Sequence, residues 1–196
     1  MMKTMCPVHH PAPSNCAWQT QSTQMQHYHD HEWGVLCCDD NQVFEKLCLE
    51  SLQAGLSWRI VLDKRPALRQ AFQQFTIKEV ATFSNHTIET LLHTPGIIHH
   101  RKKIQAICHN ATIAQQLQRK YGSLHNFLWQ FYDPNTPSPS YSIPKQALHL
   151  HQALKAVGWQ FMGPTTTYAF MQAAGMLNDH DPTCPARALV KEKNQN

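Results

Sequence analysis

The hydrophobic and polar positions of this chain follow a helical period for most of its length. Between Asp40 and Gly55, apolar residues recur at the three- and four-residue spacing of an amphipathic helix. Asp40 is suited to cap the start of that helix and Gly55 to end it. Ser57 predicts the start of a short helix, and Pro66 predicts the start of another that runs to about residue 74. The pattern therefore predicts three consecutive helices in this part of the chain.

The same period continues as far as residue 176. Thr76-Ile-Lys-Glu79 matches a capping box, which marks a helix start, and Ser123 is expected to cap a helix as well. The other helices are expected at about 87–93, 101–119, 145–157 and 165–176. The segment 133–144 contains four prolines and is predicted to be a surface connection. No convincing pair of alternating strands is found, so the expected fold class is all-α, a compact helical domain of about nine short helices.

Length and composition limit the class of protein. The chain has 196 residues, enough for one domain, and 42% of them are hydrophobic. We expect flexible tails at 1–15 and 185–196, with a folded domain at 16–184 between them. No run approaches the ~20 apolar residues of a membrane helix, and the N-terminus lacks the apolar core of a signal peptide. The seven cysteines show no framework spacing, which favours a reducing compartment. A monomeric cytoplasmic protein is therefore expected.

The charge pattern permits a nucleic-acid partner. The formal net charge is +4, and one compact basic run, Arg101-Lys102-Lys103, follows the Pro95-Gly96 turn. A looser basic group lies earlier in the chain, at Arg59, Lys64, Arg65 and Arg69. Either group could be an ordinary solvated helix face. A tight hairpin between two helices also exposes backbone N–H groups that can hold a DNA phosphate, and the adjacent basic run favours that interpretation over an ordinary helical hairpin.

Cysteine and histidine occur at ligand-like spacing near both ends of the domain. Cys16 and His29 form a C-x12-H pair, and His180 and Cys184 form an H-x3-C pair. Two thiolates and two imidazoles suit tetrahedral zinc, which would tether the two ends of the domain together. Because the chain has fourteen His and seven Cys, spacing alone leaves other interpretations open. His180 could be a helix-end cap and Cys16 a small buried residue.

Aromatic residues gather near one glutamate in the first 60 residues. Trp18, Trp33 and Trp58 accompany Tyr28, and Glu50 falls near the end of an apolar helix. Aromatic faces can stack on a flipped nucleobase and attract a cationic one, while a carboxylate accepts hydrogen bonds from an exocyclic amine. The alternative is that the tryptophans fill a core and that Glu50 caps a helix or pairs with a nearby arginine, Arg59 or Arg65. Spacing alone does not decide between the two.

Several ordered segments resemble one known family, the 3-methyladenine DNA glycosylases I, which are alkylation-repair enzymes of bacteria. The matching segments, from about residue 16 to 184, are Cys16-Ala-Trp18, Tyr28-His-Asp-His-Glu-Trp-Gly-Val35, Leu49-Glu50, Gln53-Ala-Gly-Leu-Ser-Trp58, Gly96-Ile-Ile-His-His-Arg-Lys-Lys-Ile104, Phe161-Met-Gly163, Tyr168-Ala-Phe-Met-Gln-Ala173, Asn178-Asp-His180 and Cys184. The resemblance implies a helix-hairpin-helix fold with an added structural zinc. Met25 departs from some family members, which have an aromatic residue there.

The resemblance also implies roles for individual residues. The zinc ligands would be Cys16, His29, His180 and Cys184, with Asp30 and Asp179 as their hydrogen-bonding partners. Residues of the tail, namely Cys6, His9 and His10, have no counterpart as ligands. The base-binding residues would be Tyr28, Glu50, Trp58 and Trp18, with Glu50 also catalytic. The DNA-binding residues would be Gly96, Arg101, Lys102 and Lys103, and by analogy Leu56 or a neighbour would fill the gap left by the flipped nucleotide.

The implied activity is base-excision repair. A monofunctional N-glycosylase would flip 3-methyladenine out of double-stranded alkylated DNA and hydrolyse its glycosidic bond. Two other functions remain open at this point: a non-catalytic helix-hairpin-helix DNA-binding protein with structural zinc, and a zinc hydrolase. The base-binding residues argue against the first of these. The four protein ligands argue against the second, because a hydrolytic zinc needs an open position.

Overall fold

The computed structural model describes residues 16–136, 138 and 142–194, and in these residues it contains helices but no strand. The predicted tail at 1–15 lies outside the described residues. The all-α prediction is confirmed, with ten α-helices where about nine were expected. They are α1 (Thr23–His31), α2 (Asp40–Gln53), α3 (Trp58–Ala71), α4 (Ile77–Val80), α5 (Asn85–Leu92), α6 (Arg101–Tyr121), α7 (Leu124–Trp129), α8 (Lys145–Ala156), α9 (Pro164–Ala173) and α10 (Pro185–Lys193), with 3-10 helices at Ala17–Gln21 and Gln73–Phe75.

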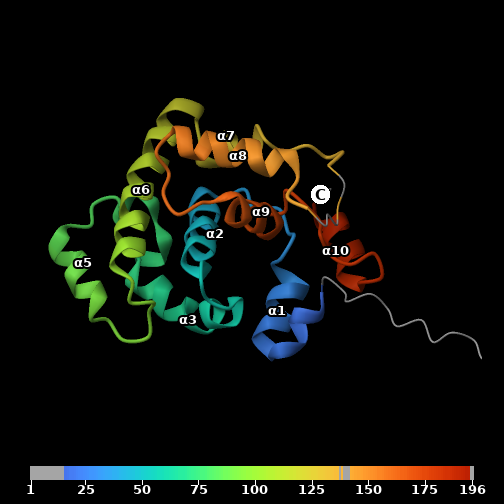
Figure 1. Cartoon of the computed structure of the whole chain (residues 1–196), viewed down its shortest axis with the longest axis horizontal. Helices are drawn as coiled ribbons and strands as arrows, with labels where there is room; N and C mark the ends of the chain where they lie inside the picture. Colours follow the sequence, from blue (N-terminus) through green and yellow to red (C-terminus); the bar gives the residue numbers. More distant parts are fainter. Residues whose placement is uncertain (1–15, 137, 139–141, 195–196) are drawn as a thin grey trace, which may run out of the picture.

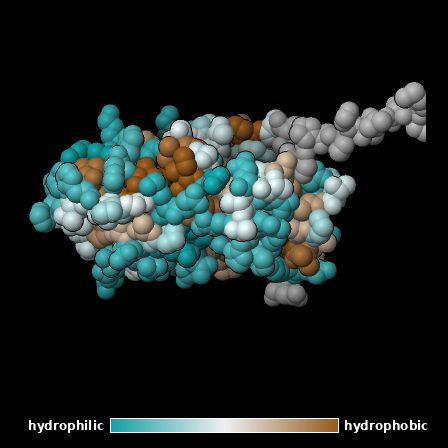
Figure 2. Space-filling model, turned by 90° about the horizontal axis from the view of Figure 1, so that it is seen from below, coloured by the Kyte–Doolittle hydropathy of each residue, from teal (hydrophilic) through white to brown (hydrophobic). Residues whose placement is uncertain are grey.

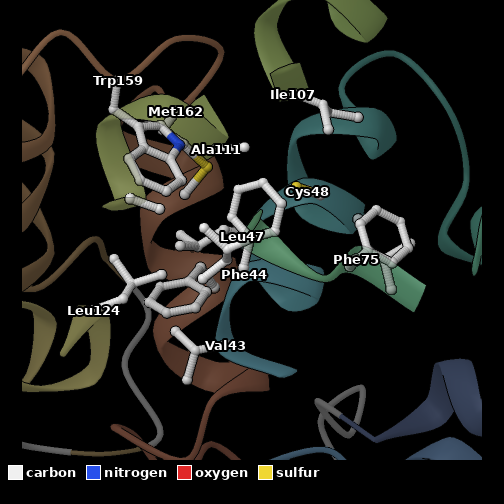
Figure 3. Packing of buried hydrophobic residues seen from close by; sticks show 14 of the residues in the cluster. Val43, Phe44, Leu47, Cys48, Phe75, Ile107, Ala111, Leu124, Trp159 and Met162 are labelled. Atoms are coloured by element: carbon white, nitrogen blue, oxygen red, sulfur yellow. The ribbon is translucent and has the colours of Figure 1, made fainter. Parts of the chain in front are cut away.

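Helix α2 forms the centre of the molecule (Figure 1). Its apolar residues Val43, Phe44 and Leu47 are fully buried, and they pack with side chains from several other helices (Figure 3). Helices α3, α6, α7 and α9 all contact α2. Because α2 is surrounded on so many sides, even polar residues on it are buried, among them Glu45 and Glu50.

Helix starts agree with the sequence at some positions and differ at others. The hydroxyls of Ser57 and Ser123 accept N–H bonds at the starts of α3 and α7, as predicted. Asp39, not Asp40, caps α2, because the Asp40 carboxylate instead accepts N–H bonds from the first turn of α7 at 2.9 Å. Helix α4 begins directly after Thr76, as the capping-box sequence predicted, but the side chain of Thr76 makes no capping hydrogen bond, so the capping box itself does not form.

Pro66 lies inside α3 and does not begin a new helix, which corrects the predicted pair of helices. Proline has no N–H to donate to the carbonyl four residues earlier, which here belongs to Leu62. The side-chain amide of Gln24 on α1 donates to that carbonyl at 2.8 Å. The Leu62 carbonyl, which lacks its usual partner within α3, therefore forms a hydrogen bond that joins α3 to α1. Helix α3 ends at Ala71, before three residues of positive φ, 73–75, which form a left-handed turn.

The two ends of the described chain lie together on one side of the molecule (Figure 1). Residues 185–193 form helix α10, not the flexible tail expected there, and α10 buries Ala186 and Val190. After α10, the side-chain amide of Asn194 bonds to the backbone of Gly34 and Leu36. These contacts give the segment a folded position that its polar composition does not reveal.

No described helix is both long and apolar enough to span a bilayer. One face of the molecule is largely hydrophilic, with separate apolar patches (Figure 2). Only 15% of residues are charged, so uncharged polar side chains contribute much of the hydrophilic surface.

Gly175, just after α9, is the glycine at which an added side chain would meet the closest contacts. Its φ is +82°, and a Cβ there would lie 2.5 Å from the backbone nitrogen of Leu36. We expect Gly175→Ala to lower the free energy of unfolding by about 2–4 kcal/mol, because it combines a left-handed backbone with a clash against another segment. Gly55→Ala is the control, since Gly55 has φ +83° but nothing within 4 Å of the added Cβ. Urea unfolding of both variants should show the larger loss for Gly175→Ala, and equal losses would contradict the steric argument.

Candidate active site and metal centre

A cavity of about 300 Å³ opens between α1, α2, α3 and α9. Four aromatic residues line it: Trp18, which precedes α1 in the sequence, Tyr28 on α1, Trp33, which follows α1, and Trp58 at the start of α3. Glu50 from the last turn of α2 also lines it. The structure therefore brings together the four residues predicted to bind a base, and it adds Trp33.

Glu50 is only 5% exposed, and no ion pair with it is formed among the described residues. The alternative interpretation of Glu50 as an arginine's partner fails, because Arg59 pairs with Asp63 and Arg65 pairs with two other glutamates. Burial raises the pKa of Glu50 to about 8, and the positive charge of Lys46, one turn earlier on α2, opposes part of that rise. The cavity thus holds a carboxyl group that changes its charge near neutral pH.

The aromatic side chains surround this carboxyl group at short range. The ring centroids of Tyr28 and Trp58 are 5.2 Å apart, and those of Trp18 and Trp33 are 5.3 Å apart and perpendicular. Burial, followed by the charge of Glu50, raises the pKa of Tyr28 well above its usual value. The Tyr28 hydroxyl therefore stays protonated and can donate a hydrogen bond.

Helix α9 supplies cavity residues that the sequence did not single out. Gln172 and Ala169 line the cavity from this helix, and Met25 lines it from α1. The side-chain amide of Gln172 donates to the Asp179 carboxylate at 2.6 Å. Gln172 falls in a segment that resembles the family, but neither that resemblance nor the helical period could show which face of α9 meets the cavity.

The four predicted zinc ligands converge on one point. The Sγ and ring nitrogen atoms of Cys16, His29, His180 and Cys184 all lie within 4.8 Å of one another. The measured pairs include His29 Nε2 to His180 Nδ1 at 3.1 Å and Cys184 Sγ to His29 Nε2 at 3.7 Å. A tetrahedral ion with bonds of about 2.0–2.3 Å holds its ligand atoms about 3.3–3.8 Å apart, so this cluster fits such an ion.

The surroundings of the cluster also suit a metal. The other ring nitrogens are occupied, because His29 Nδ1 lies 2.7 Å from Asp30 and His180 Nε2 lies 3.1 Å from the carbonyl of Trp33. Burial lowers the pKa of His180, which favours the neutral imidazole that binds a metal. Burial also raises the pKa of Cys16 to about 11, so this thiol needs a bound cation to lose its proton near neutral pH. The predicted role of Asp30 agrees with this arrangement. That of Asp179 does not, because its carboxylate accepts from Gln172 and from the hydroxyls of Ser138 and Tyr168.

The hairpin between α5 and α6 contains the predicted DNA-binding residues. Gly96 is exposed with φ +84°, and among the described residues no acceptor engages the N–H groups of 96–98. Lys102 is exposed, whereas Arg101 pairs with Glu89 across the hairpin. Lys103 differs, because it is only 6% exposed and its ammonium group donates to the carbonyls of residues 52 and 54 at 2.8 and 2.6 Å. Because the ammonium group of Lys103 is buried and already bonded, it is not available for direct contact with a phosphate.

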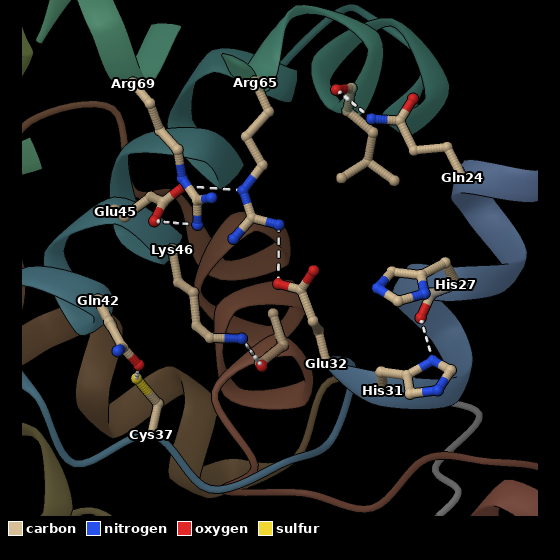
Figure 4. Close-up of polar contacts among 12 residues, drawn as sticks. Gln24, His27, His31, Glu32, Cys37, Gln42, Glu45, Lys46, Arg65 and Arg69 are labelled. Carbon is tan, nitrogen blue, oxygen red and sulfur yellow. Dashed lines mark hydrogen bonds and ion pairs between the residues drawn. The ribbon is translucent and has the colours of Figure 1, made fainter. Parts of the chain in front are cut away.

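The looser basic group is mostly occupied within the protein. Arg65 bonds to both Glu32 and Glu45 at 2.7 Å, and Arg69 bonds to Glu45 at 2.7 and 3.0 Å (Figure 4). Lys64 donates to the carbonyls of residues 96 and 97 at 3.2 Å. These charges join α1, α2, α3 and the hairpin, so they are neither a plain solvated face nor a free phosphate-binding patch.

Comparison with known proteins gives a consistent result. The family model for methyladenine glycosylase matches residues 18–188. DNA-3-methyladenine glycosylase of Haemophilus influenzae is 37% identical over 89% of this chain and 98% of its own length, and DNA-3-methyladenine glycosylase 1 of Escherichia coli is 40% identical over 86% and 94%. The solved structure of 3-methyladenine DNA glycosylase I from Staphylococcus aureus, described as the structural basis of 3-methyladenine recognition, superimposes with a TM-score of 0.82 at 35% identity. That match covers 88% of this chain and 95% of the solved one.

The family model covers most of the chain, and both curated relatives exceed 30% identity over nearly their full length. The ordered segments noted in the sequence and the helical fold agree with this result. This chain belongs to the methyladenine glycosylase family.

Proposed function

We propose that this protein is a monofunctional DNA-3-methyladenine glycosylase that takes the damaged nucleotide out of double-stranded DNA and hydrolyses its glycosidic bond. The observation that carries the proposal is Glu50, a buried carboxyl group at the wall of an aromatic cavity large enough for one nucleobase. The named activity of the curated relatives supports it, as does the recognition of 3-methyladenine by the Staphylococcus aureus protein. A DNA-binding protein without catalysis would need no such cavity.

The cavity suits a cationic base. Adenine methylated at N3 is positively charged while it is attached to deoxyribose, and its departure neutralises it, so its glycosidic bond is already weak. The faces of Trp58 and Trp18 attract a cation, and ionised Glu50 would bind the exocyclic amine and oppose the carbonyl of guanine. The Tyr28 hydroxyl would donate to a ring nitrogen or another acceptor of the base.

The hairpin is proposed to hold the DNA as a helix-hairpin-helix element. The free N–H groups at 96–98 and the exposed Lys102 would bind backbone phosphates, which anchors the duplex without reading its sequence. Leu56, 37% exposed and next in sequence to Ser57 of the cavity wall, would enter the gap left by the flipped nucleotide. Buried Lys103 would position the loop that carries Leu56, because its ammonium group closes the end of α2 just before that loop.

The Cys16, His29, His180 and Cys184 cluster is proposed to hold a structural zinc ion. Its four protein ligands would fill a tetrahedral site and leave no position for a water or substrate, which argues against a zinc hydrolase. Bound metal would fix α1 to the segment before α10 and so hold Tyr28, next to His29, against the cavity.

The proposed function can be tested by the bases that the protein releases. Duplex DNA treated with a simple methylating agent should yield free 3-methyladenine on incubation with the purified protein, identified by chromatography. No strand cleavage should accompany the release, because no lysine of the cavity wall is placed to form a Schiff base with the sugar. If the DNA kept all its 3-methyladenine, the proposal would fail.

The adjacent Lys102 and Lys103 should respond differently when each is replaced with methionine. DNA affinity falls as the salt concentration rises, and the slope of log affinity against log salt concentration reflects the number of phosphate contacts. Replacing exposed Lys102 should make this slope shallower by about 0.9, because one phosphate contact is lost. Removing buried Lys103 should leave that slope unchanged while lowering the excision rate, because the loop before α3 loses its anchor. Binding titrations at several salt concentrations would measure both slopes. A reduced slope for Lys103→Met would show that Lys103 contacts phosphate directly.

A further inference from the structure

Phe161, in the loop between α8 and α9, combines a strained backbone with an exposed ring. Its φ is +58°, in the left-handed region that is costly for a residue with a Cβ. Its side chain remains 39% exposed, so burial of the ring offsets this cost only in part. A glycine would adopt the same φ without steric cost. The fold therefore depends more on the backbone shape at this position than on the phenyl ring.

Polar side chains hold the backbone on both sides of Phe161. Asn110 on α6 donates to the carbonyl of Gln160 at 3.0 Å and accepts its N–H at 2.9 Å. His151 on α8 donates to the carbonyl of Met162 at 2.8 Å. Asn110 is almost fully buried, and so is Met162. The surrounding structure thus enforces the unusual conformation of Phe161, which is the situation typical of residues that are strained for a function.

The ring is presented beside the hairpin. Its centroid lies 6.3 Å from that of His100 with the rings nearly perpendicular. His100 caps the start of α6, directly after the turn whose N–H groups are free. The first turn of α6 also carries the exposed Lys102. An exposed apolar ring therefore adjoins the group of donors and charge that suits a DNA backbone.

We propose that Phe161 is part of the DNA interface, where its ring packs against the deoxyribose of a nucleotide whose phosphate is bound at the hairpin. The proposal rests on the proposed function, since it requires that this face meets DNA. A phenyl ring has no hydrogen-bonding group and cannot read base edges, whereas the sugar is the apolar part of the strand nearest to a bound phosphate. Such a contact does not depend on the DNA sequence. This suits an enzyme that must repair a lesion in any sequence.

Phe161→Gly separates this role from a structural one. We expect the free energy of unfolding to stay the same or to rise, because glycine removes the steric cost of the positive φ. Affinity for a duplex containing a tetrahydrofuran abasic analogue should fall by about tenfold, in keeping with the loss of one buried ring. The dependence of affinity on salt should not change, because no charge is removed.

Tyr132→Ala provides the matched control, because Tyr132 is 43% exposed and follows α7 instead of adjoining the hairpin. Its DNA affinity should equal that of the unmodified protein. If Phe161→Gly bound DNA as tightly as the unmodified protein, or lost stability and affinity together, the proposed contact would be overturned. Failure of the unmodified protein to release 3-methyladenine would instead overturn the proposed function. Binding to the abasic duplex requires no excision, so it tests the Phe161 contact separately from the activity.

Discussion

Replacing Glu50 with glutamine is expected to lower kcat/KM for release of 3-methyladenine by about 100-fold. Glutamine keeps the shape and one acceptor oxygen but removes the negative charge that would face the cationic base. Removal of one such preorganised electrostatic contact typically costs 10²–10³-fold. Release of methylated bases from DNA, followed over time, measures the effect. An unchanged rate would show that Glu50 has no role in recognition or catalysis.

The pH dependence of the same reaction tests the charge of Glu50 directly. Because burial raises its pKa to about 8, the free protein holds Glu50 mostly neutral at lower pH. We expect kcat/KM for the cationic base to rise with pH through this range and then level off, since kcat/KM follows the ionisation of the free enzyme. In Glu50→Gln this rise should be absent.

Stability should follow the opposite trend. Between pH 4.5, the usual pKa of a glutamate, and about 8, the folded protein retains a proton on Glu50 that the unfolded chain releases. The contribution of Glu50 to the free energy of unfolding is therefore fully present below pH 4.5, and it decreases as the pH rises from 4.5 to about 8. Glu50→Gln should flatten this part of the stability profile as well.

Glu45→Gln is the matched control for these experiments. Glu45 lies on the same helix and is equally buried, but it does not line the aromatic cavity. Burial acts to raise its pKa, but bonds from Arg69 and Arg65 outweigh that effect and lower it. This variant should lose stability, because Arg69 loses its charged partner and Arg65 keeps only Glu32. At a temperature where the variant is folded, its excision rate and pH profile should be unchanged. A rate loss as large as that of Glu50→Gln would remove the evidence for a specific role of the cavity carboxylate.

Loss of one proposed metal ligand should have the largest effect on stability. Cys184→Ala is expected to abolish stoichiometric metal binding and to lower Tm by about 10 °C or more, because metal binding adds its free energy to folding. The cluster joins segments more than 150 residues apart in sequence, so its loss frees both ends of the domain. Atomic emission spectroscopy would report the metal content, and thermal unfolding would report Tm.

Cys108→Ala is the control for the metal experiment, because Cys108 is buried but lies outside the cluster. It should keep its metal and lose only a few degrees of Tm, on the order of 2–4 °C for the small cavity. A chelator should lower Tm of the unmodified protein and of Cys108→Ala but not that of Cys184→Ala. Metal-free protein that stayed folded yet could not excise the base would contradict a purely structural metal.

Most of the helices and the chemical character of the site were predictable from the sequence. The period of apolar residues and the residues at turns depend on local geometry, so α2, α5, α6, α8 and α9 lie close to their expected ranges. Local signals failed where a distant group intervened. Asp40 resembles a cap for its own helix but bonds to α7, and Pro66 stays inside α3 because Gln24 takes the carbonyl that proline leaves free.

The sequence by itself determined which kinds of side chain are present and in what order: the aromatic residues, the glutamate near the end of an apolar helix, the two Cys and two His, and the basic run after the glycine turn. Only the tertiary structure decided which of these groups are free to act. Lys102 and Lys103 are neighbours of the same type, yet one faces solvent and the other closes the end of α2. The reason is physical: the charge state and availability of a polar group depend on its burial and its partners, and those partners come from parts of the chain far away in sequence.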